Sequence, residues 1–164
     1  MGIKNSSRAS LWKTLLLAMA TAVLGTGADP VLGTWTLNLA KSAYKPGPAP
    51  RSQTRVYQAT REGARVSVTT VNTDGTTTVF QFDSNADGKD YPVTGQSEAD
   101  AVSLTKVTDY ISESTLKHGD KVVAVVIREI SEDGKSMKMT YSGYSVQKGY
   151  EERVSNLAVY DKLR

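Results

Sequence analysis

The sequence predicts an all-β protein whose strands form an up-and-down antiparallel β-barrel of about eight to ten strands. Short stretches rich in Val, Thr, Tyr, Phe and Ile alternate apolar and polar residues, as in residues 65–69 and 137–141. Turn signals separate these stretches at short intervals, for example at residues 72–75 and 132–134. Short links favour sequential hairpins, and closing such a meander into a barrel removes its two exposed edges.

Ten segments have the alternation typical of half-buried antiparallel strands. They are residues 33–39, 53–60, 64–71, 76–83, 89–94, 101–107, 110–117, 121–131, 135–142 and 156–162. The stretch from Ala40 to Pro50 contains three prolines, so we expect a loop that crosses one end of the barrel.

The first 28 residues have the three parts of a secretory signal peptide. Basic residues come first, an apolar run follows at 14–25, and small residues precede a cleavage point after Ala28. The apolar run falls short of the roughly 20 residues that span a bilayer. We therefore expect a signal peptide at 1–28 and one barrel domain at 29–164. The mature protein would be periplasmic or extracellular, with no stable membrane insertion after cleavage.

The charge outside the expected signal peptide is balanced. The chain has 20 Lys and Arg against 17 Asp and Glu, and Lys4, Arg8 and Lys13 account for the whole excess. A neutral domain gives no reason to expect a nucleic-acid or anionic-membrane partner. The chain has no Cys, which excludes a disulfide framework and a lipidated cysteine. We expect a monomer.

The residues that carry common catalytic chemistry are sparse and scattered. His118 is the only His and falls in a polar turn, and without Cys it forms neither a zinc-type donor set nor a conventional triad. Residues 87–90 lack the alternating ligands of a calcium loop. Paired carboxylates such as Glu151 and Glu152 fall in predicted loops. We therefore assign no catalytic residue, metal or cofactor, and an enzyme using Tyr and carboxylate groups inside the barrel stays an alternative.

Period-two alternation assigns the side chains that face the barrel interior, provided that Trp35 points inward. The candidate ligand-binding residues are Trp35, Tyr57, Phe80, Phe82, Val125, Met139 and Tyr141. The other expected inward positions are Leu37, Leu39, Ala59, Val66, Val68, Val102, Leu104, Val123, Ile127 and Met137. Such a lining could hold one small hydrophobic or amphipathic molecule. Alternatively, these side chains fill the interior themselves.

Several motifs resemble those of lipocalins. Gly33-Thr34-Trp35 resembles the Gly-x-Trp of that family, in which the Trp packs at the closed end of the barrel. Further motifs at 32–38, 46–50, 87–93 and 156–160 are similar to small secreted bacterial lipocalin-like proteins that have no established activity. The resemblance implies a lipocalin-like barrel and an exported protein. It also implies that Arg128 or Arg153 stacks on the Trp.

These observations lead to two hypotheses of function. The first is a secreted or periplasmic protein that binds a small hydrophobic or amphipathic molecule inside its barrel. The alternative is a non-enzymatic envelope or secreted interaction module with a filled barrel. The loop at 40–51 and three tyrosines, Tyr141, Tyr144 and Tyr150, would then form its contact surface.

Overall fold

The computed structural model describes residues 28–95 and 97–164, so the expected signal peptide lies outside the described residues except for Ala28. One short 3-10 helix and twelve strands make up the secondary structure of this part of the chain. They are β1 (Gly33–Leu37), η1 (Leu39–Lys41), β2 (Ala43–Lys45), β3 (Ser52–Ala59), β4 (Ala64–Val71), β5 (Thr77–Ser84), β6 (Asp87–Pro92), β7 (Thr94–Gly95), β8 (Ala101–Lys106), β9 (Ile111–His118), β10 (Lys121–Ile130), β11 (Ser136–Tyr144) and β12 (Arg153–Lys162).

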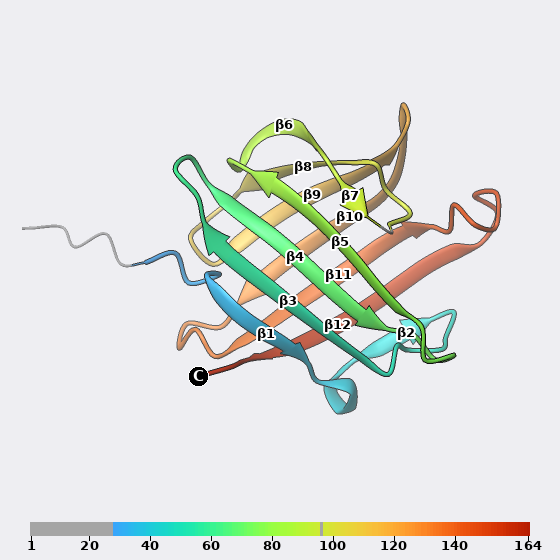
Figure 1. Cartoon of the computed structure of the whole chain (residues 1–164), viewed down its shortest axis with the longest axis horizontal. Helices are drawn as coiled ribbons and strands as arrows, with labels where there is room; N and C mark the ends of the chain where they lie inside the picture. Colours follow the sequence, from blue (N-terminus) through green and yellow to red (C-terminus); the bar gives the residue numbers. More distant parts are fainter. Residues whose placement is uncertain (1–27, 96) are drawn as a thin grey trace, which may run out of the picture.

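The strands form one antiparallel sheet that curls into a nearly closed barrel (Figure 1). Their order is β6-β8-β9-β10-β11-β12-β1-β3-β4-β5-β7, and β2 attaches to β12. The first and last strands are neighbours, since Trp35 of β1 lies opposite Lys162 of β12. The prediction of an all-β, up-and-down, lipocalin-like barrel is confirmed, but the path has eleven strands in the described residues, whereas about eight to ten were expected. The hydrogen-bonded path begins at β6 and ends at β7, and β5 and β6 are in contact without a ladder between them in the described part of the chain; we call this place the seam.

The hairpin turns use the residues that the sequence analysis singled out. Gly75 and Gly134 have φ values of +90° and +66°, which residues with a Cβ adopt only at a cost. Asp74 holds the first of these turns, because its side chain accepts a hydrogen bond from the Thr76 amide at 2.8 Å. Local turn chemistry therefore sets most of the strand boundaries.

Four expectations about individual strands and inward-facing residues are wrong. Strand β1 ends at Leu37, so Leu39 lies in η1 with 44% of its surface exposed instead of facing inward. Ala59 is exposed at the end of β3, where the hairpin turns outward. The predicted loop at 40–50 contains β2, which pairs with β12. The predicted strand at 89–94 is divided into β6 and β7, which lie at opposite edges of the sheet.

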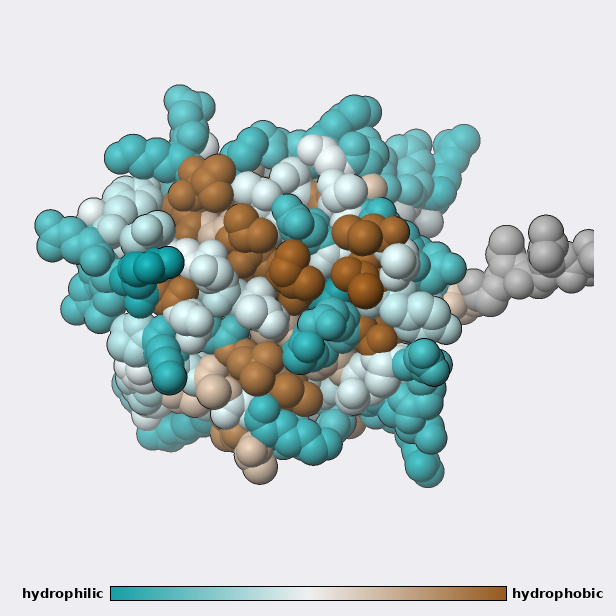
Figure 2. Space-filling model, turned by 180° about the vertical axis from the view of Figure 1, so that it is seen from behind, coloured by the Kyte–Doolittle hydropathy of each residue, from teal (hydrophilic) through white to brown (hydrophobic). Residues whose placement is uncertain are grey.

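A β-bulge in β10 overturns the predicted facing of Val125 and Ile127. The register with β9 shifts between Val122 and Ala124, so one extra residue is inserted and the alternation changes phase. Beyond the bulge it is Val126, not Val125, that borders the barrel interior. Val125 and Ile127 consequently fall on the outer wall. On the face opposite to that of Figure 1, the outer surface carries apolar side chains among polar ones (Figure 2).

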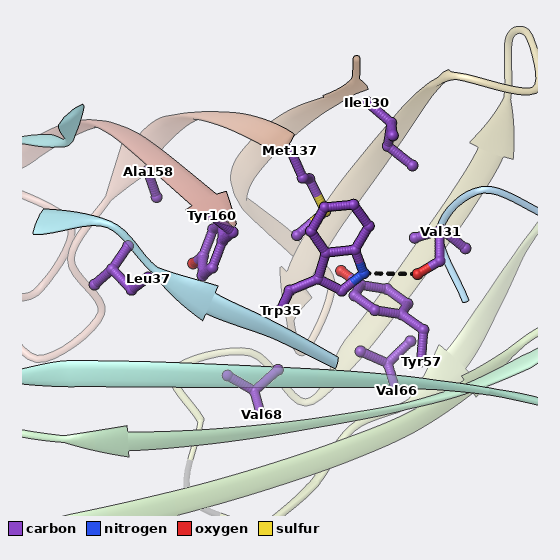
Figure 3. Close-up of a cluster of buried hydrophobic side chains, with 10 residues drawn as sticks. All are labelled: Val31, Trp35, Leu37, Tyr57, Val66, Val68, Ile130, Met137, Ala158 and Tyr160. Carbon is purple, nitrogen blue, oxygen red and sulfur yellow. Dashed lines mark hydrogen bonds between the residues drawn. The ribbon is translucent and has the colours of Figure 1, made fainter. Parts of the chain in front are cut away.

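The hydrophobic core fills one end of the barrel (Figure 3). Trp35 is completely buried there, and its indole Nε1 donates a hydrogen bond to the carbonyl of Val31 at 2.7 Å. The segment before β1 is thereby fastened across this end. Lys162 strengthens the closure, because its Nζ donates to the Pro30 carbonyl at 2.9 Å and lies 5.0 Å from the Trp35 ring. The cation over the Trp35 ring is thus Lys162, whereas Arg128 or Arg153 was expected there.

Candidate functional site

The barrel encloses a cavity of about 320 Å³ next to this core. Residues from most of the long strands line this cavity. Because the cavity is empty of side chains, the interior of the barrel is not completely filled. Its walls include Phe80 and Phe82 of β5, Val126 of β10 and Met139 of β11. Apolar walls of this kind favour the apolar part of a ligand over water.

The structure separates the seven predicted site residues into three groups. Phe80, Phe82, Met139 and Tyr141 border the cavity together. Trp35 and Tyr57 point inward as expected but belong to the buried core that closes the end. Val125 lies outside the barrel because of the bulge in β10.

Two polar residues of β3 that the sequence analysis did not select also border the cavity. Gln53 and Arg55 alternate with Tyr57 along the strand, so all three side chains point inward. The period-two pattern starting from Tyr57 was the signal that could have identified them. Charged residues are rarely buried without a partner, and for this reason an apolar set was expected there.

Arg55 is held by polar and aromatic neighbours inside the barrel. Its Nε donates a hydrogen bond to the Tyr57 hydroxyl at 3.2 Å, and its Nη1 donates to Gln53 Oε1 at 3.4 Å. Its guanidinium carbon lies 5.8 Å from the centre of the Tyr160 ring. The Tyr160 hydroxyl also donates to Gln53 Oε1, so the four side chains form one network.

Arg128 approaches the same tyrosine from β10. Its guanidinium carbon lies 5.4 Å from the centre of the Tyr57 ring. The Arg128 Nε is buried and has no hydrogen-bond partner among the described residues, and the same holds for the Oγ of Ser112. Ser112 lies directly opposite Arg128 in the β9–β10 ladder. Two unsatisfied polar atoms therefore occur at one level of the barrel.

The pKa values in this network follow from burial and charge. Burial alone lowers the pKa of Arg55, but the oxygens of Tyr57 and Tyr160 raise it above its ordinary value. Burial alone raises the pKa of Tyr57, but the guanidinium groups of Arg55 and Arg128 lower it below its ordinary value. Arg55 is therefore positively charged inside the barrel.

Two further tyrosines lie where the cavity opens. Burial raises the pKa of Tyr44 to about 12, with a smaller contribution from Tyr160, while Arg55 opposes it. Burial also raises the pKa of Tyr141 to about 12, and the Glu98 carboxylate adds to this effect. Both hydroxyls are consequently neutral and able to donate hydrogen bonds at physiological pH.

An outer depression of about 560 Å³, which we call the mouth, continues the cavity toward solvent. Tyr44, Glu98 and Tyr141 line both spaces. Pro46 to Pro50 form one side of the mouth, in agreement with the expectation that this loop crosses a barrel end. The Glu98 carboxylate accepts weak hydrogen bonds from the Ser145 hydroxyl and the Val146 amide, both at 3.4 Å.

The tyrosines proposed for a contact surface do not gather on one exposed face. Tyr141 borders the cavity, and Tyr150 is half-buried with the Nζ of Lys121 4.7 Å from its ring centre. Tyr144 is 41% exposed at the end of β11. The interaction-module hypothesis therefore loses most of its tyrosine surface.

No three His, Cys, Asp or Glu side chains in the described ranges 28–95 and 97–164 gather into a group that could hold a metal ion. His118 lies at the end of β9, with its Nδ1 3.8 Å from a carboxylate oxygen of Asp100. No helix in these ranges is long and apolar enough to cross a membrane.

Comparison of the chain with protein-family models, with curated proteins and with solved structures found no match.

Proposed function

We propose that this protein binds one small hydrophobic or amphipathic molecule inside its barrel. The observation that carries the proposal is the cavity of about 320 Å³, bordered by Phe80, Phe82, Val126 and Met139 and open to solvent at the mouth. Ligand sites in proteins are concave, largely apolar and of roughly 300–1,000 Å³. Tyr44 and Tyr141 add polar groups at the entrance, which suits a molecule with one polar part.

The proposal is tested by titrating the purified mature chain with the neutral fluorescent probe N-phenyl-1-naphthylamine. Saturable binding of one probe per chain is expected. Val126→Phe should weaken binding by about tenfold, because the added ring occupies the cavity. Val125→Phe is the matched control, since it adds the same ring to the outer wall one residue away. Absence of saturable binding, or an equal effect of the two variants, would overturn the proposal.

We also propose that the barrel acts outside the cytoplasm. The basic and apolar pattern of residues 1–28 supports this. Expression of the full chain in a bacterium, followed by fractionation and mass measurement, should show an exported product that begins at Asp29. An uncleaved cytoplasmic product would contradict the proposal.

A further inference from the structure

The strongest unexplained feature of the interior is positive charge without a carboxylate partner. Among the described residues, no Asp or Glu lies within ion-pair distance of Arg55 or Arg128. The exposed Arg65 differs, because it forms a two-bond pair with Asp83 at 2.8 and 2.9 Å. A charge removed from water is costly unless an opposite charge and hydrogen bonds compensate it.

The carboxylate in the cavity lining does not pair with Arg55, because it forms hydrogen bonds with other residues. Glu98 is the acidic side chain that borders the cavity, but it lies at the mouth and bonds to Ser145 and Val146. Arg55 instead contacts neutral acceptors, the Tyr57 hydroxyl and the Gln53 amide oxygen. These two bonds use two of the five N–H groups of the guanidinium, and no carboxylate among the described residues pairs with Arg55.

We propose that Arg55, supported by Arg128 and Tyr57, binds the carboxylate head group of an amphipathic ligand whose tail lies along the apolar wall of the cavity. This inference rests on the proposed function and specifies the class of ligand. A guanidinium is a planar fork that matches the two oxygens of a carboxylate. Arg128 adds positive charge beside Tyr57, where its Nε and the Ser112 hydroxyl lack hydrogen-bond partners within the part of the chain that the structure describes.

The placement of polar and apolar groups orients the ligand. Arg55 lies midway along β3, between Gln53 toward the mouth and Tyr57 toward the closed end. The apolar side chains of Phe80, Val126 and Met139 surround the remaining space. The head group therefore lies at the level of Arg55, and the tail lies along the apolar wall of the cavity. A buried ion pair of this kind discriminates between head groups more than it adds affinity.

The test compares three ligands with the same tail, which are dodecanoate, dodecanol and dodecyltrimethylammonium. Each competes with N-phenyl-1-naphthylamine for the mature chain at neutral pH. The wild-type chain should bind dodecanoate about tenfold or more tightly than dodecanol, with the cation weakest. Arg55→Met should weaken dodecanoate binding by about tenfold to a hundredfold and leave dodecanol binding unchanged.

Three controls separate the possible outcomes. Arg65→Met removes a guanidinium from the outer wall and should bind every ligand as the wild type does. Arg55→Lys keeps the charge without the fork and should fall between the wild type and Arg55→Met. Retained binding of the neutral probe by Arg55→Met shows that the variant is folded with an intact cavity.

Equal binding of dodecanoate and dodecanol by a wild-type chain that binds the neutral probe would overturn the carboxylate inference alone. Wild-type affinity of Arg55→Met for dodecanoate would do the same. If neither the probe nor any dodecyl compound binds, the proposed function fails and the inference fails with it.

Discussion

Gly143 of β11 lies against the backbone of Val123 so closely that a Cβ on Gly143 would come within 2.1 Å of the Val123 carbonyl oxygen. This approach occurs at the bulge of β10, where Gly143 is paired with Ala124. The bulge sets the facing of every later residue of β10, including Val126 and Arg128. A glycine at the rim of the barrel therefore helps to decide which side chains form the cavity.

Replacing Gly143 with Ala should destabilise the protein by about 1–3 kcal/mol, because the added methyl group collides with backbone that cannot move away cheaply. Urea denaturation followed by Trp fluorescence measures the change. Ser142→Ala, which alters the neighbouring exposed residue of the same strand, is the control and should have little effect. If Gly143→Ala is as stable as that control, the close approach does not constrain the bulge.

Truncation of Trp35 should be among the most damaging single changes in the core. Trp35→Ala is expected to cost about 3–5 kcal/mol, because it removes a completely buried ring and leaves a cavity. Trp35→Phe keeps most of the packing but leaves the Val31 carbonyl without its donor, at about 1–3 kcal/mol. Both values come from urea denaturation followed by circular dichroism. A loss below 1 kcal/mol for Trp35→Ala would show that the closed end does not depend on this residue.

Arg55→Met should stabilise the ligand-free protein even though it impairs ligand binding. Replacing an internal charge that has no carboxylate partner with an apolar side chain of similar length removes a desolvation cost, and replacing buried ion pairs by apolar side chains gives gains of about 1–4 kcal/mol. Arg65→Met breaks only an exposed pair and should change the free energy of unfolding by less than about 1 kcal/mol. Thermal and urea unfolding measure both. A larger loss of stability in Arg55→Met than in Arg65→Met would contradict this interpretation of Arg55.

Stability should decrease at high pH as buried tyrosines ionise. Tyr44 and Tyr141 have pKa values of about 12 in the folded chain against 10.0 for the ordinary group, so the folded state binds more protons between these values. The stability from these two groups is complete below pH 10 and is lost as the pH rises to about 12. Tyr57 acts in the opposite sense, since its lowered pKa adds stability as the pH rises toward 10.

Tyrosinate absorbance as a function of pH measures these steps directly. A late step near pH 12 is expected, and Tyr141→Phe should remove a large part of it. Denaturant unfolding at pH 9 and pH 11 should give a smaller loss of stability for this variant than for the wild type. Retention of the whole late step in Tyr141→Phe would show that its hydroxyl is open to water.

Local sequence patterns predicted most strands, because the alternation and the turn residues that define a strand lie within a few residues of one another. Strand β4 matches its predicted bounds of 64–71, and β3, β5, β8, β9, β10 and β11 match theirs to within two residues. Turn residues with positive φ and alternating side chains suffice for this. The same alternation correctly placed Phe80 and Phe82 inside the barrel, because β5 contains no irregularity.

The sequence by itself thus determined most of the strands, the turns and the all-β class, whereas the inward position of Trp35 was the premise from which the other inward positions followed. Only the tertiary structure decided the pairing of β2 with β12 and the division of residues 89–94 at the seam. It also decided which side chains of β10 face the barrel interior. A bulge depends on the backbone of the neighbouring strand, which alternation within one strand does not contain. The environment of Arg55 likewise depends on which side chains meet across the barrel, and strands distant in sequence supply them.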